Sequence, residues 1–163
     1  MIDTQGIREV MIDEGLNPYL GVPVILADQI NKAPAYPFVV IRFNDFSGEP
    51  IGHPARVVVG NVLRTTETVI WTIDFQTEAE DPDVSARLAH QVRDWFRTSR
   101  LLQDRFGIGV ANVGGIDDRA IALGAEWEYR HGIEIELRVT NTIIQPLEAI
   151  EAAKIEEVDP LGN

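Results

Sequence analysis

Residues 126–141 read EWEYRHGIEIELRVTN and carry the strongest pattern in the chain. The odd positions from Trp127 to Val139 are aromatic, aliphatic or histidine. The charged residues stand at even positions, namely Glu126, Glu128, Arg130, Glu134, Glu136 and Arg138. This alternation has the period of a β-strand, in which successive side chains point to opposite faces. The stretch therefore predicts a long antiparallel strand with one buried face and one solvated face.

Other strands are predicted earlier in the chain. Residues 68–76 alternate in the same way, and residues 38–43 are rich in β-branched and aromatic side chains. Two valine-rich runs, 57–59 and 62–63, flank Gly60-Asn61, a pair suited to a two-residue hairpin turn. Proline and glycine predict loops at residues 44–56 and 106–115, followed by a strand or extended segment at 116–123.

One helix stands out after these strands. Asp81 is a good N-cap, and Pro82 suits the first helical position. A continuous apolar stripe follows, formed by Val84, Leu88, Val92, Trp95 and Phe96. The stripe predicts a long helix that lies across the sheet.

The two ends of the chain complete the predicted fold. A helix is expected from about Asp3 to Glu14, capped by Thr4 and stopped near Gly15. Pro146 is expected to begin a short acidic helix with a loose end. The predicted class is α+β: a mainly antiparallel sheet with one long helix packed on one face, plus N-terminal and C-terminal helical segments. Residues 1–145 are expected to form a single domain, followed by an acidic, partly helical segment at 146–163.

Composition narrows the classes of function. The 163 residues include no cysteine, which excludes a disulfide framework, a thiolate zinc site and a cysteine nucleophile, and fits a reducing cytoplasm. The net charge of −12 lacks the basic footprint of a nucleic-acid reader and would be repelled by an anionic membrane. With no signal peptide and no run long enough to span a bilayer, no membrane partner is expected.

A search for catalytic motifs indicates a protein that is not an enzyme and uses no cofactor. Gly107-x-Gly109 lacks the third glycine of a dinucleotide fingerprint, because Asn112 stands in its place. The three histidines have no metal-ligand spacing, and His131 is expected to be a hydrogen-bonded core or interface residue. Acidic pairs such as Asp117-Asp118 are better explained as solvated side chains than as a carboxylate or metal-dependent hydrolase, which stays as an alternative.

Several short stretches resemble the neck or tail-terminator proteins of tailed bacteriophages and prophages. They are YPFVVIR at 36–42, WTIDFQ at 71–76, ARL at 86–88, FGI at 106–108, EWEYR at 126–130 and IEIEL at 133–137. The likeness covers roughly residues 20 to 142. It implies a structural α+β subunit of the virion, assembled in the host cytoplasm, and it carries no catalytic motif. Another phage tail-completion or head-closure protein is the alternative within the same setting.

The resemblance also implies partners. The subunit would form a ring, typically a homohexamer, that caps the tail tube and joins it to the head–tail connector. Neighbouring subunits in such rings commonly extend one another's sheets, and DNA passes through the lumen without specific binding. An acidic lumen would let DNA slide, since it offers no cations to the phosphates. The candidate lumen residues are Glu126, Glu128, Glu134 and Glu136.

Candidate interface residues lie on the hairpin region at 44–64 and on the segment from Gln145. Loops of that length carry apolar side chains that have little to cover within one small domain. The residues are Phe46, Ile51, Val57, Val59, Val62, Leu147 and Ile150.

Overall fold

The protein was analysed as a computed structural model that describes residues 2–28, 32–45, 48 and 50–147. The helical elements are α1 (Thr4–Glu9), the π-helix η1 (Val10–Leu16), α2 (Asn17–Leu20), α3 (Pro82–Thr98) and α4 (Leu101–Phe106). The strands are β1 (Val24–Leu26), β2 (Phe38–Asp45), β3 (Pro50–Val59), β4 (Val62–Ala79), β5 (Gly109–Asp118), β6 (Ile121–Leu123) and β7 (Glu126–Pro146).

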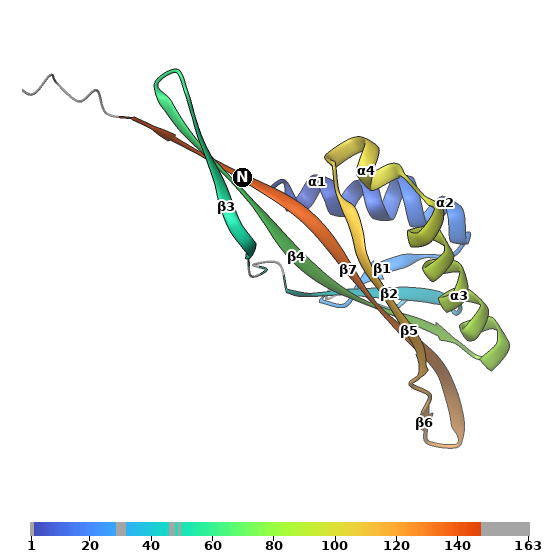
Figure 1. The fold of residues 1–163 in the computed structure, drawn as a ribbon. Helices are drawn as coiled ribbons and strands as arrows, with labels where there is room; N and C mark the ends of the chain where they lie inside the picture. Colours follow the sequence, from blue (N-terminus) through green and yellow to red (C-terminus); the bar gives the residue numbers. More distant parts are fainter. Residues whose placement is uncertain (1, 29–31, 46–47, 49, 148–163) are drawn as a thin grey trace, which may run out of the picture.

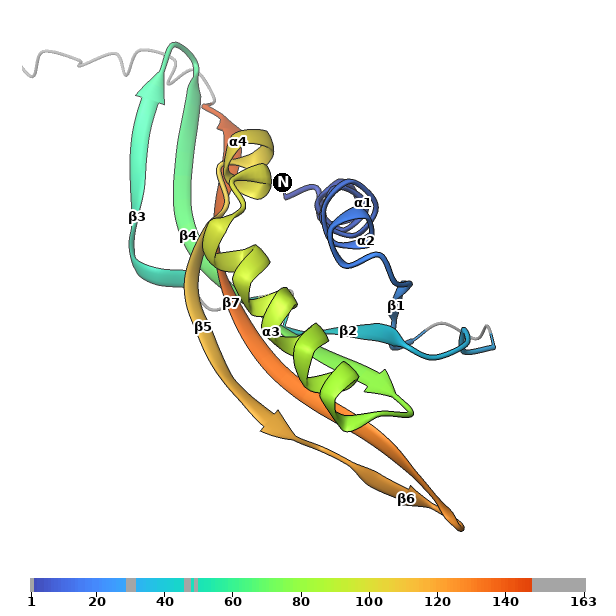
Figure 2. The same cartoon turned by 90° about the vertical axis from the view of Figure 1, so that its right-hand side faces the viewer.

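Two long strands form the centre of the sheet. β4 and β7 are antiparallel and stay in register from Val62 opposite Pro146 to Ala79 opposite Tyr129. The strand order is β1-β2-β4-β7-β5, with β3 added beside β4 and β6 beside β7. The helices gather over the middle of this sheet (Figures 1 and 2). The β3 end of the β4–β7 ribbon projects beyond them on one side, and the β6–β7 hairpin projects on the other (Figures 1 and 2).

The core lies between the helices and one face of the middle of the sheet. Alternate side chains of β4 and β7 enter it, and the fully buried ones include Trp71, Ile73, Phe75, Ile133, Ile135 and Leu137. The predicted stripe of α3 packs here, with Phe96 at 5.2 Å from Phe75 between ring centroids. This confirms the buried face predicted for both strands.

The predicted fold class is wrong. Strands account for 52% of the structure and helices for 29%. The sheet is mixed because β1 runs parallel to β2, where the prediction had a mainly antiparallel sheet. In place of one long helix covering a face, short helices from two parts of the chain share the layer. None of the helices in the described residues exceeds the 17 residues of α3.

The N-terminal helical segment differs from its prediction at both ends. Asp3, and not Thr4, is the cap, because its carboxylate accepts a hydrogen bond of 2.9 Å from the Gly6 amide. The helical segment continues through Gly15 and ends at Gly21, which has a φ of 68°. Pro18 does not end the helical segment and lies at the junction where the π-helix η1 passes into α2.

Two predicted loops are strands. β3 begins at Pro50, within residues predicted to be a loop, and β5 begins at Gly109. Proline is tolerated in β3 because the strand pairs with β4 on one side. Gly114 fits β5 because a Cβ there would lie 2.8 Å from the Glu134 carbonyl oxygen. Sequence composition indicated turns where the structure has an edge strand and an irregular strand.

β7 is longer than predicted and changes character at its ends. It continues to Pro146, so the helix predicted to begin there does not begin at this residue. The predicted continuation of that acidic segment, with its loose end, lies outside the described residues. At the start of β7 the burial is inverted, since Trp127 is 59% exposed and Glu128 only 6%.

Candidate functional site

Three strand segments project from one end of the sheet, and together we call them the wing: β3, residues 62–69 of β4 and residues 139–146 of β7 (Figure 1). All ten residues of β3 are exposed. The exposed large apolar side chains of the wing are Ile51, Val57, Val58, Val59, Ile143 and Ile144. An apolar surface of this kind is typical of a protein–protein contact site.

The register of the wing places several predicted interface residues on one face. Val57 lies opposite Arg64, which in turn lies opposite Ile144, so the three form one row across three strands. Val59 lies opposite Val62. This pair is two residues along each strand from Val57 and Arg64, so it lies on the same face. Val58 points to the other side, because successive residues of a strand alternate. The structure therefore brings Val57, Val59 and Val62 together.

The other predicted interface residues are more scattered. Ile51 lies opposite Thr68 at the inner end of the wing and is exposed. Leu147 follows β7, and its amide donates a 2.9 Å hydrogen bond to the carbonyl of Asn61 in the hairpin turn. Phe46 and Ile150 lie outside the described residues.

β3 is an edge strand. Among the strands of the described ranges it pairs with β4 alone, so its outer backbone groups face away from the sheet. Such an edge can accept a strand from another chain. On the far side of the ribbon, the last β5 residue paired with β7 is Gly109, opposite Arg138. The wing thus extends beyond both the helices and β5.

The four glutamates predicted for an acidic face do not form one cluster. Glu134 is exposed and Glu136 half-buried, and they lie opposite Asp74 and Thr72 on the sheet face away from the core. Glu126 is exposed but belongs to the hairpin with β6 at the far end of the molecule. Glu128 is buried.

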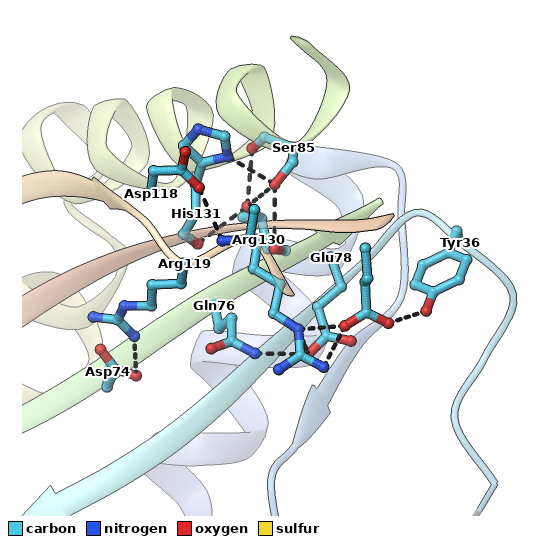
Figure 3. Close-up of polar contacts among 12 residues, drawn as sticks. Tyr36, Asp74, Gln76, Glu78, Ser85, Asp118, Arg119, Arg130 and His131 are labelled. Atoms are coloured by element: carbon cyan, nitrogen blue, oxygen red, sulfur yellow. Dashed lines mark hydrogen bonds and ion pairs between the residues drawn. The ribbon is translucent and has the colours of Figure 1, made fainter. Parts of the chain in front are cut away.

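Arginines interrupt the acidity of this face. The Arg119 side chain lies over Gly132, where a Cβ would come within 2.0 Å of its guanidinium carbon. It donates a hydrogen bond of 2.8 Å to Asp74 (Figure 3). It donates another, of 2.7 Å, to Asp117. The bond to Asp74, and then that to Asp117, raise the pKa of Arg119 above its usual range. The glycine lets one cation cross β7 and reach β4.

Glu128 belongs to a second polar group, at the β6–β7 end. It accepts hydrogen bonds from the Tyr36 hydroxyl and from Arg130, which also lies 4.0 Å from Glu78 (Figure 3). The hydrogen bond to Glu128, with desolvation, raises the pKa of Tyr36 to about 12. These contacts tie the segment before β2 to β7 and account for the burial of Glu128.

A buried serine and a histidine approach each other at the start of α3. His131 Nδ1 lies 3.0 Å from Ser85 Oγ, a distance that would suit a nucleophile and its base (Figure 3). Ser85 is fully buried, however, and its hydroxyl also lies 3.0 Å from that of Thr77. No substrate can reach it, so the group joins α3 to β4 and β7 as a structural contact. The predicted hydrogen bond of His131 is confirmed.

The described residues contain neither a candidate metal site nor a helix suited to a membrane. No group of three or more histidine or acidic side chains is arranged to hold a metal ion. None of the helices there has the length and apolar character needed to cross a membrane.

A comparison with known protein families shows to which family the chain belongs. The family model described as phage neck terminator protein matches residues 5–160. The chain belongs to the phage neck terminator protein family. None of the curated proteins compared with it matches the chain. The suspected family is therefore confirmed, and the match extends beyond the residues 20–142 on which the resemblance rested.

Membership of the neck terminator family gives the surfaces a context. This is a family of structural proteins, so the chain is a component of the phage virion that interacts with other tail and head proteins. An exposed apolar surface such as the wing is typical of such contacts.

Sequence reasoning missed three features of this neck terminator. It assigned residues 50–56 of β3 to a loop, it did not single out Ile143 and Ile144, and it did not foresee Arg119 crossing β7. Adjacent isoleucines after a cleanly alternating strand were a signal, because they place an apolar residue on both faces. The crossing had no local signal, since Arg119 and Asp74 are 45 residues apart.

Proposed function

We infer that the chain is a subunit of a ring that caps the phage tail tube and joins it to the head–tail connector. The observation that carries the proposal is the wing: three strands with apolar side chains exposed on both faces, in a member of a structural neck family. A monomer gains nothing from holding Val57, Val59 and Ile144 in water. A contact with another chain removes that surface from solvent.

The same feature supports self-association over contact with a single partner. The wing offers both an apolar face and the outer edge of β3, so a neighbouring copy can pair with a strand and cover side chains together. Repetition of one contact around an axis closes a ring. Six copies is the number expected from the family resemblance, with assembly in the host cytoplasm before incorporation into the virion.

The proposal is tested on tail tubes polymerised from the tube protein of the same phage. Negative-stain microscopy should find the purified chain as a collar at tube ends, and tubes should stop growing when it is added. Tubes that elongate at an unchanged rate, with no density at their ends, would contradict the capping function. Addition of the purified connector should then join capped tubes, and not bare ones, to the connector.

A second part of the proposal concerns DNA. Glu134 and Glu136 face away from the core and are candidates for a lumen surface that does not hold phosphates. Glu134→Lys should slow genome ejection, because a ring of new cations would bind the passing backbone. Glu9→Lys is the matched control, since Glu9 is exposed on α1 and the charge change is the same. Equal ejection rates for the two variants would remove Glu134 from the lumen.

A further inference from the structure

The β6–β7 hairpin lies at the opposite end of the sheet from the wing (Figures 1 and 2), and it carries a second set of exposed apolar side chains. A groove of about 440 Å³ opens there between the β6–β7 hairpin and the end of β4. Its apolar lining includes Trp127, Leu123 and Tyr36, of which Trp127 is 59% and Leu123 52% exposed. A tryptophan and a leucine held in solvent on a hairpin tip contribute little to the core, so they are available to another surface.

The groove is acidic as well as apolar. Glu80, Glu126 and Glu128 line it. Glu128 is engaged by Tyr36 and Arg130, whereas Glu80 and Glu126 are exposed and make no ion pair with any of the described residues. Leu123 lies opposite Glu126, so an exposed apolar side chain and a free carboxylate share one face of the hairpin. Such a face suits an arginine, whose guanidinium bonds to the acids while its aliphatic stem packs on the apolar side chain.

The wing has the complementary character. Its charged residues are Arg56, Arg64 and Glu67, and Glu67 accepts a hydrogen bond from Asn141. The wing therefore carries a net positive charge in a chain whose net charge is −12. Arg64 is exposed, forms no ion pair with the described residues, and stands between Val57 and Ile144 in one row.

We propose that the row Val57–Arg64–Ile144 of one copy docks in the Trp127–Leu123 groove of the next copy. The Arg64 guanidinium meets the carboxylates of Glu80 and Glu126, while the two aliphatic side chains cover Leu123, which lies opposite Glu126 on the same face of the hairpin. The inference rests on the proposed ring function and adds to it the partner of the wing. Because each chain carries both surfaces at opposite ends, the contact is head-to-tail, which is the kind that closes into a ring.

Charge reversal tests the pairing. Arg64→Glu alone, and Glu80→Arg with Glu126→Arg, should each convert rings to monomers at concentrations where the unaltered chain is fully assembled. The chain with all three reversals should assemble again, because each contact then carries the swapped pair. Its recovery also excludes misfolding as the cause of the losses. Rings that survive Arg64→Glu, or a triple variant that stays monomeric, would overturn the docking.

The absence of cysteine allows a direct test of proximity. Ile144→Cys and Leu123→Cys, co-expressed on separate chains, should give a disulfide-linked pair under mild oxidation, and neither variant alone should do so. Ile143→Cys replaces Ile144→Cys in the control, since Ile143 is 42% exposed on the opposite face of the same strand. Linkage through position 143 and not 144, or through neither, would overturn the docking.

These experiments separate the inference from the function on which it rests. If the unaltered chain forms rings at tube ends but the reversals and the cross-link fail, the proposed function stands and the docking is wrong. If the unaltered chain forms no ring, the proposed function fails first. Cross-linking of Ile144→Cys to itself in the absence of Leu123→Cys would indicate wing-to-wing dimers. That result would contradict both the docking and the proposed ring.

Discussion

The middle of the sheet and the wing are built from the same two strands, β4 and β7, in one uninterrupted register. In the middle, alternate side chains such as Ile135 are fully buried beneath the helices. In the wing, beyond the buried Val69 and Val139, the helical layer is absent, and the same alternation leaves apolar residues in solvent on both faces. The strand pattern alone therefore does not fix the role of a residue. Whether a helix covers the strand decides whether an isoleucine is buried in the core or exposed to solvent.

The largest expected effect comes from one substitution made in both regions. Ile135→Ala should lower the free energy of unfolding by about 2–5 kcal/mol, because it empties space in a buried core. Ile144→Ala, on the same strand but 61% exposed, should change it by less than about 0.5 kcal/mol. Urea unfolding at a concentration below assembly measures both. Equal losses would remove the distinction between the two regions.

A smaller effect is expected where Arg119 crosses β7. Gly132→Ala should displace the guanidinium from Asp74, since the new Cβ would lie 2.0 Å from its central carbon. The cost should be about 0.5–1 kcal/mol, the range for a partly exposed ion pair. Gly115→Ala is the matched control, because no atom lies within 4 Å of a Cβ there. Chemical denaturation compares them, and a Gly132→Ala variant as stable as the control would show that the crossing contributes nothing.

The smallest effect concerns pH at the β6–β7 end. The pKa of Tyr36 is raised from 10.0 to about 12, so its contribution to stability is fully present below about pH 10 and is lost as pH rises through about 12. Glu128→Gln should lower the pKa of Tyr36 toward 10.0, because it removes the carboxylate that accepts a hydrogen bond from the Tyr36 hydroxyl. Phenolate absorbance against pH follows the ionisation, with Tyr36→Phe identifying its share. A titration unchanged by Glu128→Gln would refute the assignment.

The regions differ in how far sequence could predict them. Alternation in β4 and β7 and the capped stripe of α3 identified the buried face, because core packing imposes a period on the sequence. The parallel β1–β2 pairing and the first seven residues of β3, 50–56, were missed, since neither leaves a periodic signal and proline and glycine are usually found in turns. The burial of Glu128 was missed because its partner Tyr36 is 92 residues away in the sequence.

The candidate site was predicted in part for the same reasons. The hairpin at Val57 to Val62 could be predicted because its turn residues are adjacent in the sequence. The pairing of β3 with β4 confirms it. Its role as an interface stays a proposal, as does the lumen role of Glu134 and Glu136. The groove at Trp127 could not be predicted, since the alternation placed that residue on the buried face.

Mass photometry of the unaltered chain beside Val57→Asp and Val58→Asp tests the central claim most directly. The two valines are adjacent on β3 and almost equally exposed, at 56% and 59%, but they face opposite sides of the wing. The account predicts a discrete ring for the unaltered chain, its loss in Val57→Asp and its retention in Val58→Asp. A monomer at every concentration, or rings that Val57→Asp leaves intact, would contradict it.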